Sequence, residues 1–566
     1  MAPPNLPVNM INDVSLPDII EEYFDLSDGK LSVRGVPLLD EVPNNVTFSP
    51  FNSICQPCDD VPLPLLNRVG ALSHKGGFLG FKADVPSDRL KNSLGRSSDR
   101  DFLSIFRFKT WWSTMWVGNS GSNLQKETQW VLFDVPEIKS YVIIIPIIDG
   151  SFRSALQPGN DGHVVICAES GSTLLEEKSV PNLVEKFDWC TWDAFYLTVE
   201  PAGIWHGINE FTEAGVSPRF LIVDDGWQSI SFDENEDPNE DAKNLPGATY
   251  LNAKITPCVL LPGLDGTMND LAVDKVLEGG MGLVHLDYAS LLYDSMHSYL
   301  SEVGVTGVKV DVIHILEYVS EEHGGRVELT KAYYKGLNDS LAKNFNGSGL
   351  ISSMQQCNDF FFLGTKQISI GRAGDDFWFQ DPSGDLMGVY WLQGVHMIHC
   401  SYNSMWMGQM IVPDWDMFQS DQLCAKYHAG SRAFCGGPVY LSDFVGSHDF
   451  DLIKKLVHPD GTVPNCLHCA LPTRDCLFKN PLFDGKTALK IWNFNKFGGV
   501  IGGFNCQGAG WDPKEQRIKG FPDCYKPIHC SVHVSDIEWD QNLELAHMGK
   551  AEEYIVHLNQ DDEPAF

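Results

Sequence analysis

The sequence lacks the features of a membrane protein or of a nucleic-acid-binding protein. No stretch of 18 apolar residues occurs in the 566-residue chain, so no transmembrane helix is expected. The chain carries 75 acidic against 41 basic side chains, a formal net charge of −34 at pH 7, with no dense run of Lys and Arg. Such a surface repels phosphates and anionic lipids, so we expect neither a nucleic acid nor a membrane as partner. Since no basic stretch followed by an apolar core opens the sequence, a cytoplasmic location is the default expectation.

Motifs that hold metals or cofactors are also missing. No GxxxxGK[ST] or GxGxxG loop follows a predicted strand, and no HxxxH or HxH spacing occurs among the scattered His314, His396, His399 and His428. We therefore expect no cofactor and no metal centre. The fifteen cysteines are odd in number and spread over the chain, which favours reduced thiols. Two CxxC pairs could supply four thiolates to zinc only if distant segments met in space; they are Cys55/Cys58 and Cys466/Cys469.

The hydrophobic patterning predicts a multidomain α/β protein. Residues 1–180 show short alternating runs between Gly, Pro, Asn and Asp, for example Phe102 to Trp112, Gln129 to Phe133 and Ser140 to Ile148, which is typical of an antiparallel, sandwich-like β domain. Residues 181–455 alternate extended runs with helical patterns, which favours a parallel (β/α)8-type barrel. Residues 456–566 return to β-like runs, at Ala488 to Asn493 and Gly498 to Asn505, and predict a partial C-terminal β domain.

The predicted barrel is one strand short. Helices are expected near 203–214, 289–303 and 329–345, and we count seven strands, at 186–196, 219–227, 307–312, 349–355, 367–375, 397–406 and 436–443. The acidic run Ser231 to Leu245 is interpreted as a solvated loop. Tyr250 to Leu261 could serve as an eighth strand, although Pro257 would stand where a central strand needs its N–H.

Carboxylates follow the predicted barrel strands repeatedly, as in Asp224-Asp225-Gly226-Trp227, Lys309-Val310-Asp311 and Pro413-Asp414-Trp415-Asp416. The carboxyl ends of the strands form the active-site face of such a barrel. Glycosidic-bond chemistry needs two carboxyl groups across the scissile bond, one ionised and one protonated. The pattern therefore indicates a carbohydrate-active enzyme.

Two of these motifs are the candidates for the catalytic pair. Lys309 and Asp311 are two residues apart on one strand, so both side chains point to the same side, and the cation would keep Asp311 ionised as a nucleophile. In Arg372-Ala-Gly-Asp375-Asp376-Phe-Trp378, like-charge proximity and burial would raise one pKa and keep a proton for a general acid. Taken alone, a Lys–Asp pair can be purely structural, and an Asp-Asp pair is usually a turn or a cap.

Tryptophans accompany the carboxylates, as a sugar ring with one apolar face requires. They are Trp189, Trp192, Trp227, Trp378, Trp406 and Trp415. A single tryptophan is more often part of the core, but their co-occurrence with Asp at several strand ends favours a sugar site.

Six segments carry a resemblance to a known family: KFDWCTWDAFY, FLIVDDGWQSI, GVKVDVIHILEYV, GRAGDDFWFQDPSGD, WMGQMIVPDWDMFQS and SRAFCGGPVYLSD. They closely resemble the plant raffinose-oligosaccharide enzymes of glycoside hydrolase family 36, nearly from end to end. The segments FDLSDGKLSVRGVPLL, VGNSGSNLQKETQW, KGFPDCYKPIHCSVHV and KAEEYIVHLNQ resemble the members that transfer galactose from galactinol to raffinose.

The resemblance implies a double displacement with net retention. Asp311 would attack galactinol and release myo-inositol, and raffinose would then take the galactose from the enzyme. By motif match the acid/base is Asp375, with Asp376 as a possible substitute. The residues matched to the galactose subsite are Trp192, Asp193, Asp224, Asp225, Trp227, Lys309, Arg372, Asp414 and Trp415. No cofactor is implied, and the partners are small sugars: galactinol, raffinose and sucrose.

Departures from the family pattern limit this expectation. The chain looks shortened near Gly171 to Leu174, near Leu245 to Ala248, where a barrel strand should stand, and at its C-terminus. A missing strand leaves exposed sheet edges, so an inactive remnant is one alternative. Within the enzyme class the alternatives are transfer to sucrose and hydrolysis by water. Residues that choose the acceptor cannot be placed from one sequence.

Overall fold

The computed structural model describes most of the chain. The described residues are 23–50, 76–83, 89–97, 99–147, 152–170, 182–227, 255–257, 282–284, 286–318, 320, 325–345, 349–355, 357–364, 368, 370–380, 388–542, 545–558 and 563–565. Cys55, Cys58 and the acidic run Ser231 to Leu245 lie outside these residues.

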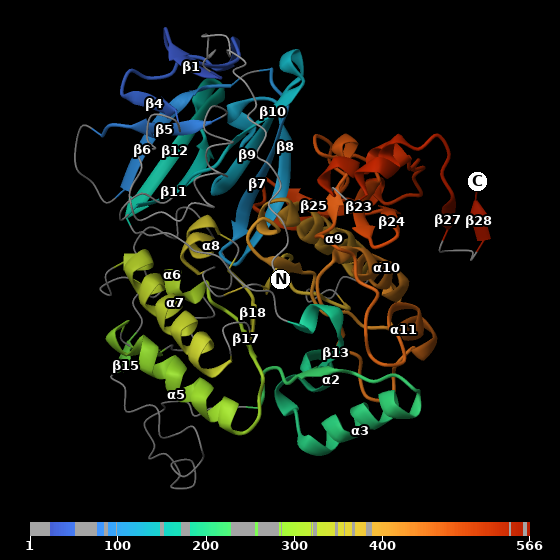
Figure 1. The fold of residues 1–566 in the computed structure, drawn as a ribbon. Helices are drawn as coiled ribbons and strands as arrows, with labels where there is room; N and C mark the ends of the chain where they lie inside the picture. Colours follow the sequence, from blue (N-terminus) through green and yellow to red (C-terminus); the bar gives the residue numbers. More distant parts are fainter. Residues whose placement is uncertain are drawn as a thin grey trace, which may run out of the picture.

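The N-terminal part is built from antiparallel strands. Its main sheet has the order β6-β12-β11-β9-β7-β8, with β10 beside β9. A second layer holds the β1-β2-β3 sheet and the β4-β5 hairpin, and apolar side chains of both layers share one core. The sheet lies at one end of the molecule in blue and cyan (Figure 1). The strands are β1 (Phe24–Ser27), β2 (Lys30–Val33), β3 (Val36–Leu39), β4 (Val46–Pro50), β5 (Gly77–Phe81), β6 (Arg89–Arg96), β7 (Phe102–Lys109), β8 (Trp112–Gly118), β9 (Thr128–Val135), β10 (Ser140–Ile144), β11 (Phe152–Pro158) and β12 (His163–Ser170).

Short parallel strands alternate with helices in the middle of the chain. They form two sheets, β14-β13-β21 and β17-β18-β19-β20. A parallel bridge between Phe418, just after β20, and Leu441 of β21 links the two sheets. The strands are β13 (Phe187–Cys190), β14 (Phe220–Ile222), β17 (Val308–Val310), β18 (Leu350–Ser352), β19 (Ile370–Arg372), β20 (Val412–Asp414) and β21 (Val439–Leu441).

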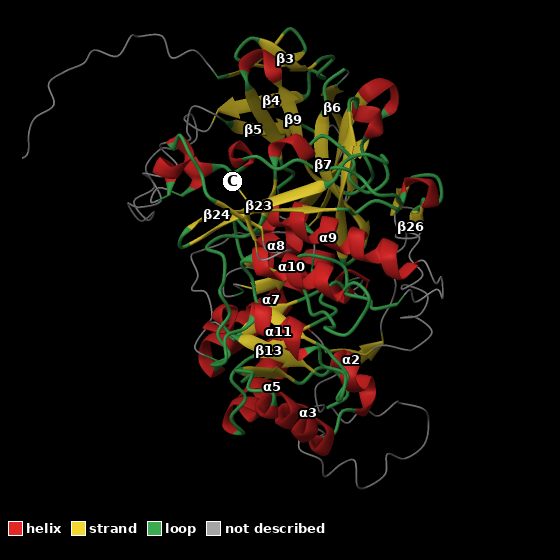
Figure 2. Ribbon diagram, turned by 90° about the vertical axis from the view of Figure 1, so that its right-hand side faces the viewer, coloured by secondary structure: helices red, strands yellow, loops and turns green. Residues whose placement is uncertain are grey.

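Helices separate these strands and cover the sheets (Figure 2). The predictions near 203–214, 289–303 and 329–345 are confirmed by α3, α5 and α7. Gly436 ends α10 with a left-handed φ of 72°, and a Cβ there would lie 1.8 Å from the His468 carbonyl oxygen, so only glycine fits. The helices are α2 (Trp192–Phe195), α3 (Pro201–Glu213), α5 (Ala289–Glu302), α6 (Ile315–Tyr318), α7 (Gly325–Asn344), α8 (Asn358–Gly364), α9 (Gly388–Met407), α10 (Ala425–Cys435) and α11 (Phe450–Leu456).

The strand predicted at 397–406 is wrong, because this segment is the second half of helix α9. Its residues are buried on nearly every side, since α9 contacts β8, β20, β22 and β25. A helix that is buried all round has no exposed face with a 3.6-residue period, so its pattern does not distinguish it from a buried strand. The sixth parallel strand is instead β20, which begins five residues after α9 ends.

The two parallel sheets leave two edges open within the described residues. β14 pairs with β13, β17 pairs with β18, and neither has a second described neighbour. Of the candidate strand Tyr250 to Leu261, the described part is β15 (Ile255–Pro257), which pairs antiparallel with β16 (Gly282–Val284) and with neither parallel sheet.

The C-terminal part returns to antiparallel strands, as predicted from the runs at 488–493 and 498–505. β23 and β24 pair along their full length, and α9 and α10 pack against this part. The strands are β22 (Leu471–Pro472), β23 (Leu489–Asn495), β24 (Gly498–Phe504), β25 (Ala509–Asp512), β26 (Arg517–Gly520), β27 (Val556–Leu558) and β28 (Glu563–Ala565).

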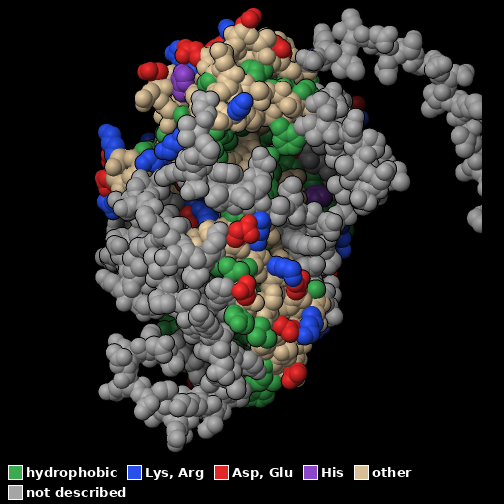
Figure 3. Space-filling model, turned by 90° about the vertical axis from the view of Figure 1, so that its left-hand side faces the viewer, with side chains coloured by type: hydrophobic (Ala, Val, Ile, Leu, Met, Phe, Trp, Pro, Cys, Tyr) green, Lys and Arg blue, Asp and Glu red, His purple; other side chains and the backbone are tan. Residues whose placement is uncertain are grey.

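The described surface shows no separate field of positive charge on the face drawn in Figure 3, where Lys and Arg side chains lie beside Asp and Glu. No helix of the described part of the chain is long and apolar enough to cross a membrane.

A buried group of charges joins the N-terminal sheet to the helices after β17. Arg107 of β7 donates to Glu127 at 3.1 Å and forms an ion pair of 2.5 Å with Glu317 of α6. Glu127 also accepts from Arg153 of β11 at 2.6 Å, and Arg326 of α7 pairs with Glu317. Burial alone would raise the pKa of Glu127, but the charges of Arg153 and Arg107 outweigh it and hold that pKa at about 2.

Replacing Glu127 with Gln should therefore destabilise the protein at neutral pH. The substitution removes the carboxylate that the buried Arg107 and Arg153 share, while Arg107 keeps Glu317, and breaking such a buried pair costs on the order of 3–5 kcal/mol. Chemical denaturation at pH 7 measures the loss. Because the pKa of Glu127 lies below its ordinary value of 4.5, the difference between wild type and Glu127→Gln should shrink as the pH falls from 4.5 toward 2.

The matched control is Glu515→Gln, which removes a carboxylate from an exposed pair with Arg517 and should leave the denaturation midpoint unchanged. Equal midpoints for wild type and Glu127→Gln would mean that the buried charges do not hold the two parts together.

Candidate active site

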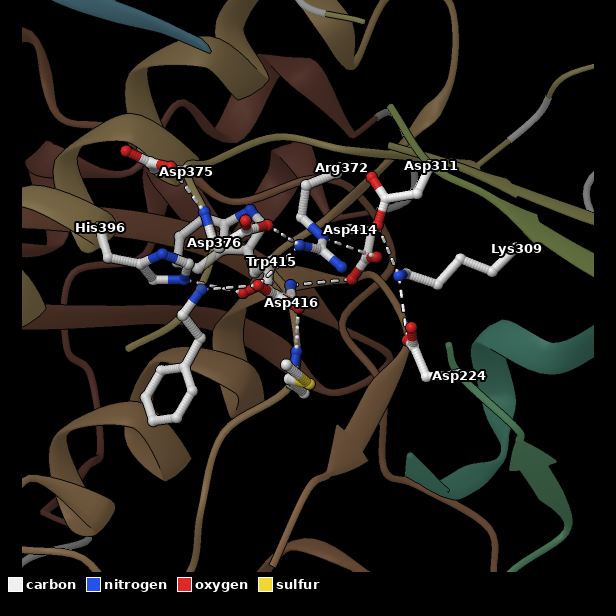
Figure 4. Close-up of polar contacts among 12 residues, drawn as sticks. Asp224, Lys309, Asp311, Arg372, Asp375, Asp376, His396, Asp414, Trp415 and Asp416 are labelled. Carbon is white, nitrogen blue, oxygen red and sulfur yellow. Dashed lines mark hydrogen bonds and ion pairs between the residues drawn. The ribbon is translucent and has the colours of Figure 1, made fainter. Parts of the chain in front are cut away.

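Lys309 lies between two carboxylates at the ends of the open strands. It belongs to β17, and its Nζ is 2.8 Å from Asp311 Oδ2 and 3.0 Å from Asp224 Oδ2. Asp224 follows β14, and Asp311 follows β17 directly. Figure 4 shows the ammonium group reaching both carboxyl groups. The two strands share no backbone ladder, so this side chain is what links their carboxyl ends.

The cation determines the charge state of Asp311. Burial would raise the pKa of Asp311, but the charges of Lys309 and Arg372 outweigh it and hold that pKa at about 2. Burial likewise opposes the charge on Lys309, and Asp311 and Asp224 overcome it and raise the pKa of Lys309 above its ordinary range. The Val312 N–H also donates to Asp311 Oδ1 at 2.9 Å. Asp311 is therefore an ionised carboxylate at neutral pH, as a nucleophile must be.

A second cation, Arg372, holds three further carboxyl groups. This guanidinium, at the end of β19, is 2% exposed. It is 2.7 Å from Asp416, 3.2 Å from Asp376 and 3.4 Å from Asp414. Tyr440 of β21 donates its hydroxyl to Asp414 at 2.8 Å, which satisfies a carboxylate that is fully buried.

Asp375 and Asp376 are adjacent in sequence but have different surroundings. The Asp376 N–H donates to Asp375 Oδ1 at 2.9 Å. The Asp376 carboxyl turns toward Arg372, whereas Asp375 lies at the far side of the group from Lys309 (Figure 4). Burial, with the negative charges of Asp416, Asp311 and Asp375, raises the pKa of Asp376 to about 8 against the opposing charge of Arg372. Burial and Asp414 also raise the pKa of Asp416. The site thus keeps Asp311 ionised while it raises the pKa of the neighbouring Asp376 and Asp416 carboxyl groups.

The N-terminal sheet reaches this site through the turn between β7 and β8. Lys109 Nζ is 3.0 Å from Asp375 Oδ2 and lies over the Trp111 ring, 5.5 Å from its centroid. The Trp111 ring packs on His314, three residues after Asp311, with 4.7 Å between centroids. One turn of the β sheet therefore touches both loops that carry the candidate catalytic carboxylates.

Several residues predicted for the sugar site lie elsewhere or in other roles. Asp193 is 3% exposed, accepts from the Ser442 hydroxyl, and has its pKa raised to about 7, mainly by burial. Trp415 is fully buried in the core, where its indole N–H donates to Ser404 at 3.2 Å. Trp192 meets Tyr196 edge to face, and Trp227 is 45% exposed with Asp225 beside it. A fully buried indole ring cannot stack on a sugar, so Trp415 is not part of the proposed sugar-binding set.

Four residues of the site had no predicted role. They are Asp416, Tyr440, Lys109 and Cys190, whose thiol is 3.4 Å from Asp224 Oδ2. The motif around Asp414 contained Asp416, so strand-end position could have found it. Lys109 carried no signal, because it lies 266 residues from Asp375 in another sheet. Among the described residues, no group of three or more His, Cys, Asp or Glu side chains is placed to hold a metal ion.

Comparison with known families assigns the chain. The family model described as raffinose synthase or seed imbibition protein Sip1 matches residues 24–174, 173–249 and 245–565. The chain belongs to this family. It is 52% identical to the stachyose synthase of Pisum sativum over 96% of this chain and 84% of that protein. It is 48% identical to the probable galactinol–sucrose galactosyltransferase 4 of Arabidopsis thaliana, over 100% and 86%.

The likeness to solved structures is more distant. The GH36 α-galactosidase AgaA of Geobacillus stearothermophilus overlaps 75% of this chain and 70% of its own, with 10% identity and a TM-score of 0.38. That likeness is too low to add to the fold described above.

Lys309→Met should lower the thermal stability of this raffinose synthase family member at pH 7, by several degrees in the melting temperature. The change leaves Asp311 and the largely covered Asp224 without the ammonium group that pairs with both, and removing one partner of a poorly solvated ion pair is destabilising. The deficit should shrink toward pH 4, because protonation neutralises the unpaired carboxyl groups.

The control for charge alone is Lys335→Met, which removes a lysine from an exposed pair with Asp339 on α7. A Lys309→Met deficit that stays constant from pH 7 to pH 4 would assign the effect to packing and not to charge.

Proposed function

We propose that this chain is a retaining α-galactosyltransferase of raffinose-oligosaccharide synthesis, which moves galactose from galactinol to raffinose and gives stachyose and myo-inositol. The observation that carries the proposal is one site that holds an ionised Asp311, with Lys309 at 2.8 Å, together with the Asp375–Asp376 pair, in which the pKa of Asp376 is raised to about 8. Retaining transfer needs two carboxyl groups, one ionised and one that holds a proton. The identity of 52% with a stachyose synthase supports raffinose as the acceptor.

The proposed mechanism is a double displacement at the anomeric carbon. Asp311 attacks the galactosyl carbon while an acid protonates the oxygen of the departing myo-inositol. The same group then removes the proton from the acceptor hydroxyl as that oxygen attacks the galactosyl-enzyme. We assign the acid/base to Asp375, which matches the family motif, with Asp376 as the alternative that its raised pKa favours. Two inversions give net retention.

The galactose subsite would be formed by the polar groups around the two cations. We assign Lys309, Arg372, Asp224 and Asp414 to this subsite. Lys309 and Asp224 are partly exposed and can bind sugar hydroxyls, whereas Arg372 and Asp414 are buried behind them and hold the surrounding carboxyl groups in place. Trp192 and Asp193 belong to α2, which follows β13, and Asp225 and Trp227 belong to the loop after β14; these four residues complete the proposed set.

The two parallel sheets support a (β/α)8-type barrel that lacks one strand. Seven parallel strands in two linked sheets, open between β14 and β17, fit such a barrel with a gap at that place. The breaks in the family match, at 173–174 and 245–249, fall where we expect the chain to be shortened. The alignment with the pea enzyme runs over 719 positions, more than the 566 residues of this chain, which also supports internal shortening.

The open strand edges favour a second candidate function, that of a sugar-binding protein without turnover. Unpaired edges cost stability and can distort the site. A cooperative melting transition that shifts upward with galactinol indicates an intact binding site, because a ligand of the folded state stabilises it by mass action. Binding without product formation would favour this candidate over the transferase.

Purified protein incubated with galactinol and raffinose should release stachyose and myo-inositol in equal amounts, and Asp311→Asn should release neither. The amide cannot attack the anomeric carbon, while its similar shape preserves the fold. Chromatography of the products measures both. Parallel reactions with sucrose as acceptor, and with galactinol alone, distinguish stachyose formation from raffinose formation and from hydrolysis.

Asp339→Asn, an exposed aspartate of α7, is the control for asparagine substitution and should keep full activity. Turnover by Asp311→Asn at the wild-type rate would remove Asp311 from the mechanism, and raffinose as the main product would reassign the acceptor to sucrose.

Asp375→Asn should slow transfer from galactinol by about 10²- to 10⁴-fold, the usual contribution of general acid catalysis. It should slow the first step much less with an aryl α-galactoside, whose leaving group needs no proton. The comparison of the two donors measures the acid role. If Asp376→Asn shows this donor dependence and Asp375→Asn does not, the two assignments must be exchanged.

A further inference from the structure

The turn between β7 and β8, residues 109–112, places a cation of the N-terminal sheet on the candidate acid/base. We propose that Lys109 is a positioning residue for Asp375, which fixes the direction of its carboxyl group and favours the form that accepts a proton. The inference rests on the proposed function, since it assigns a partner to the proposed acid/base. Nothing in the sequence motifs of the barrel points to this residue.

Geometry fixes the Asp375 carboxyl from two sides. Oδ2 pairs with Lys109 Nζ at 3.0 Å, and Oδ1 accepts the Asp376 N–H at 2.9 Å. The Lys109 side chain is 36% exposed and the Asp375 side chain 18%, so the pair lies at the mouth of the site and a sugar hydroxyl can approach it. A carboxyl group held at both oxygens keeps one orientation, which proton transfer to a defined oxygen requires.

The turn itself is anchored on both sides of Lys109. Arg107, two residues earlier, enters the buried charge group with Glu317 at 2.5 Å. Trp111, two residues later, packs on His314. Asn403 of α9 donates to the carbonyl oxygen of Ser113 at 2.9 Å and to that of Ala373 at 2.7 Å. The same amide thus ties β8 to the loop that carries Asp375, so Lys109 and Asp375 cannot move apart independently.

The other charged and titratable groups around Asp375 are few. Asp376 is its neighbour on the same loop, with Arg372 behind it. His399 of α9 faces both Asp375 and Lys109, and burial lowers the pKa of His399 to about 4, so it stays neutral at working pH. Lys109 is therefore the cation placed to act directly on the Asp375 carboxyl, whereas Arg372 is engaged with Asp376, Asp414 and Asp416.

The chemical consequence concerns the second half of the reaction. After myo-inositol leaves with the proton, Asp375 is a carboxylate, and it must take a proton from the acceptor hydroxyl while that oxygen bonds to the galactosyl carbon and the bond to Asp311 breaks. An adjacent ammonium group stabilises the carboxylate that begins this step. The same ammonium group, 3.0 Å from Asp375, opposes the protonated form of this carboxyl group that the first step uses.

The test is Lys109→Met, which keeps length and removes charge, compared with Lys109→Arg, which keeps the charge. In transfer from galactinol to raffinose, the basic limb of the pH profile of kcat/KM should move upward by about one pH unit in Lys109→Met. Lys109→Arg should restore the wild-type limb. Lys30→Met, which breaks a 3.2 Å pair with Asp40 in the same domain, should leave the profile unchanged.

A Lys109→Met profile identical to that of wild type, in an enzyme that turns over, would overturn the inference while leaving the proposed function intact. If the wild-type chain forms no product, the proposed function fails, and the pair is then judged by melting temperatures of Lys109→Met, Asp375→Asn and the double variant. If the double variant loses less in melting temperature than the sum of the two single variants, the result supports the Lys109–Asp375 pair. If the losses add, the result overturns it.

Discussion

The balance between five carboxyl groups and two cations governs the site. Lys309 and Arg372 cannot neutralise the five if all are ionised, and an uncompensated charge in a buried place is costly. The site resolves the excess by keeping Asp311 ionised beside Lys309 and by raising the pKa of Asp376 and Asp416. The five carboxyl groups are those of Asp224, Asp311, Asp376, Asp414 and Asp416. Two protonation states at short range, which the proposed chemistry needs, follow from this shortage of positive charge.

The N-terminal sheet is part of the same electrostatic arrangement. Arg107 of this sheet pairs with Glu317 of α6, and Lys109 pairs with Asp375. Buried ion pairs add little net stability compared with apolar packing, but they impose one geometry, because a shifted partner leaves a bare charge. A different orientation of the β sheet against the parallel strands would therefore be strongly unfavourable. The ion pairs thus fix how the residues of both parts meet at the site.

The sequence predicted the parts of the site that follow from strand periodicity. Lys309 and Asp311 are two residues apart at the end of one strand, so their side chains were expected on the same side. Asp224 and Asp414 follow strands whose carboxyl ends meet at one edge, so a pattern of strands was enough to place them in one site. The helix at 388–407 was missed in part because its described side chains are buried on nearly every side and form no exposed polar face. Trp415 was expected at the sugar, since a Trp beside Asp is indistinguishable in sequence from a Trp in the core. Lys109 depends on a contact between distant segments, which no local pattern encodes.

The open edges of β14 and β17 concern the stability of the sheets and not the charge contacts of the site. Within the described residues neither β14 nor β17 has a strand on its outer side, so neither edge forms backbone hydrogen bonds to a second described strand. Lys309 nevertheless joins Asp224 and Asp311 across the same opening, at 3.0 Å and 2.8 Å. The carboxyl ends of the two strands are thus joined through the Lys309 side chain. In the described residues no backbone ladder pairs β14 with β17. If the proposed barrel is short of a strand at this place, the loss falls on the backbone hydrogen bonds of its wall, while the charges at the carboxyl ends stay joined.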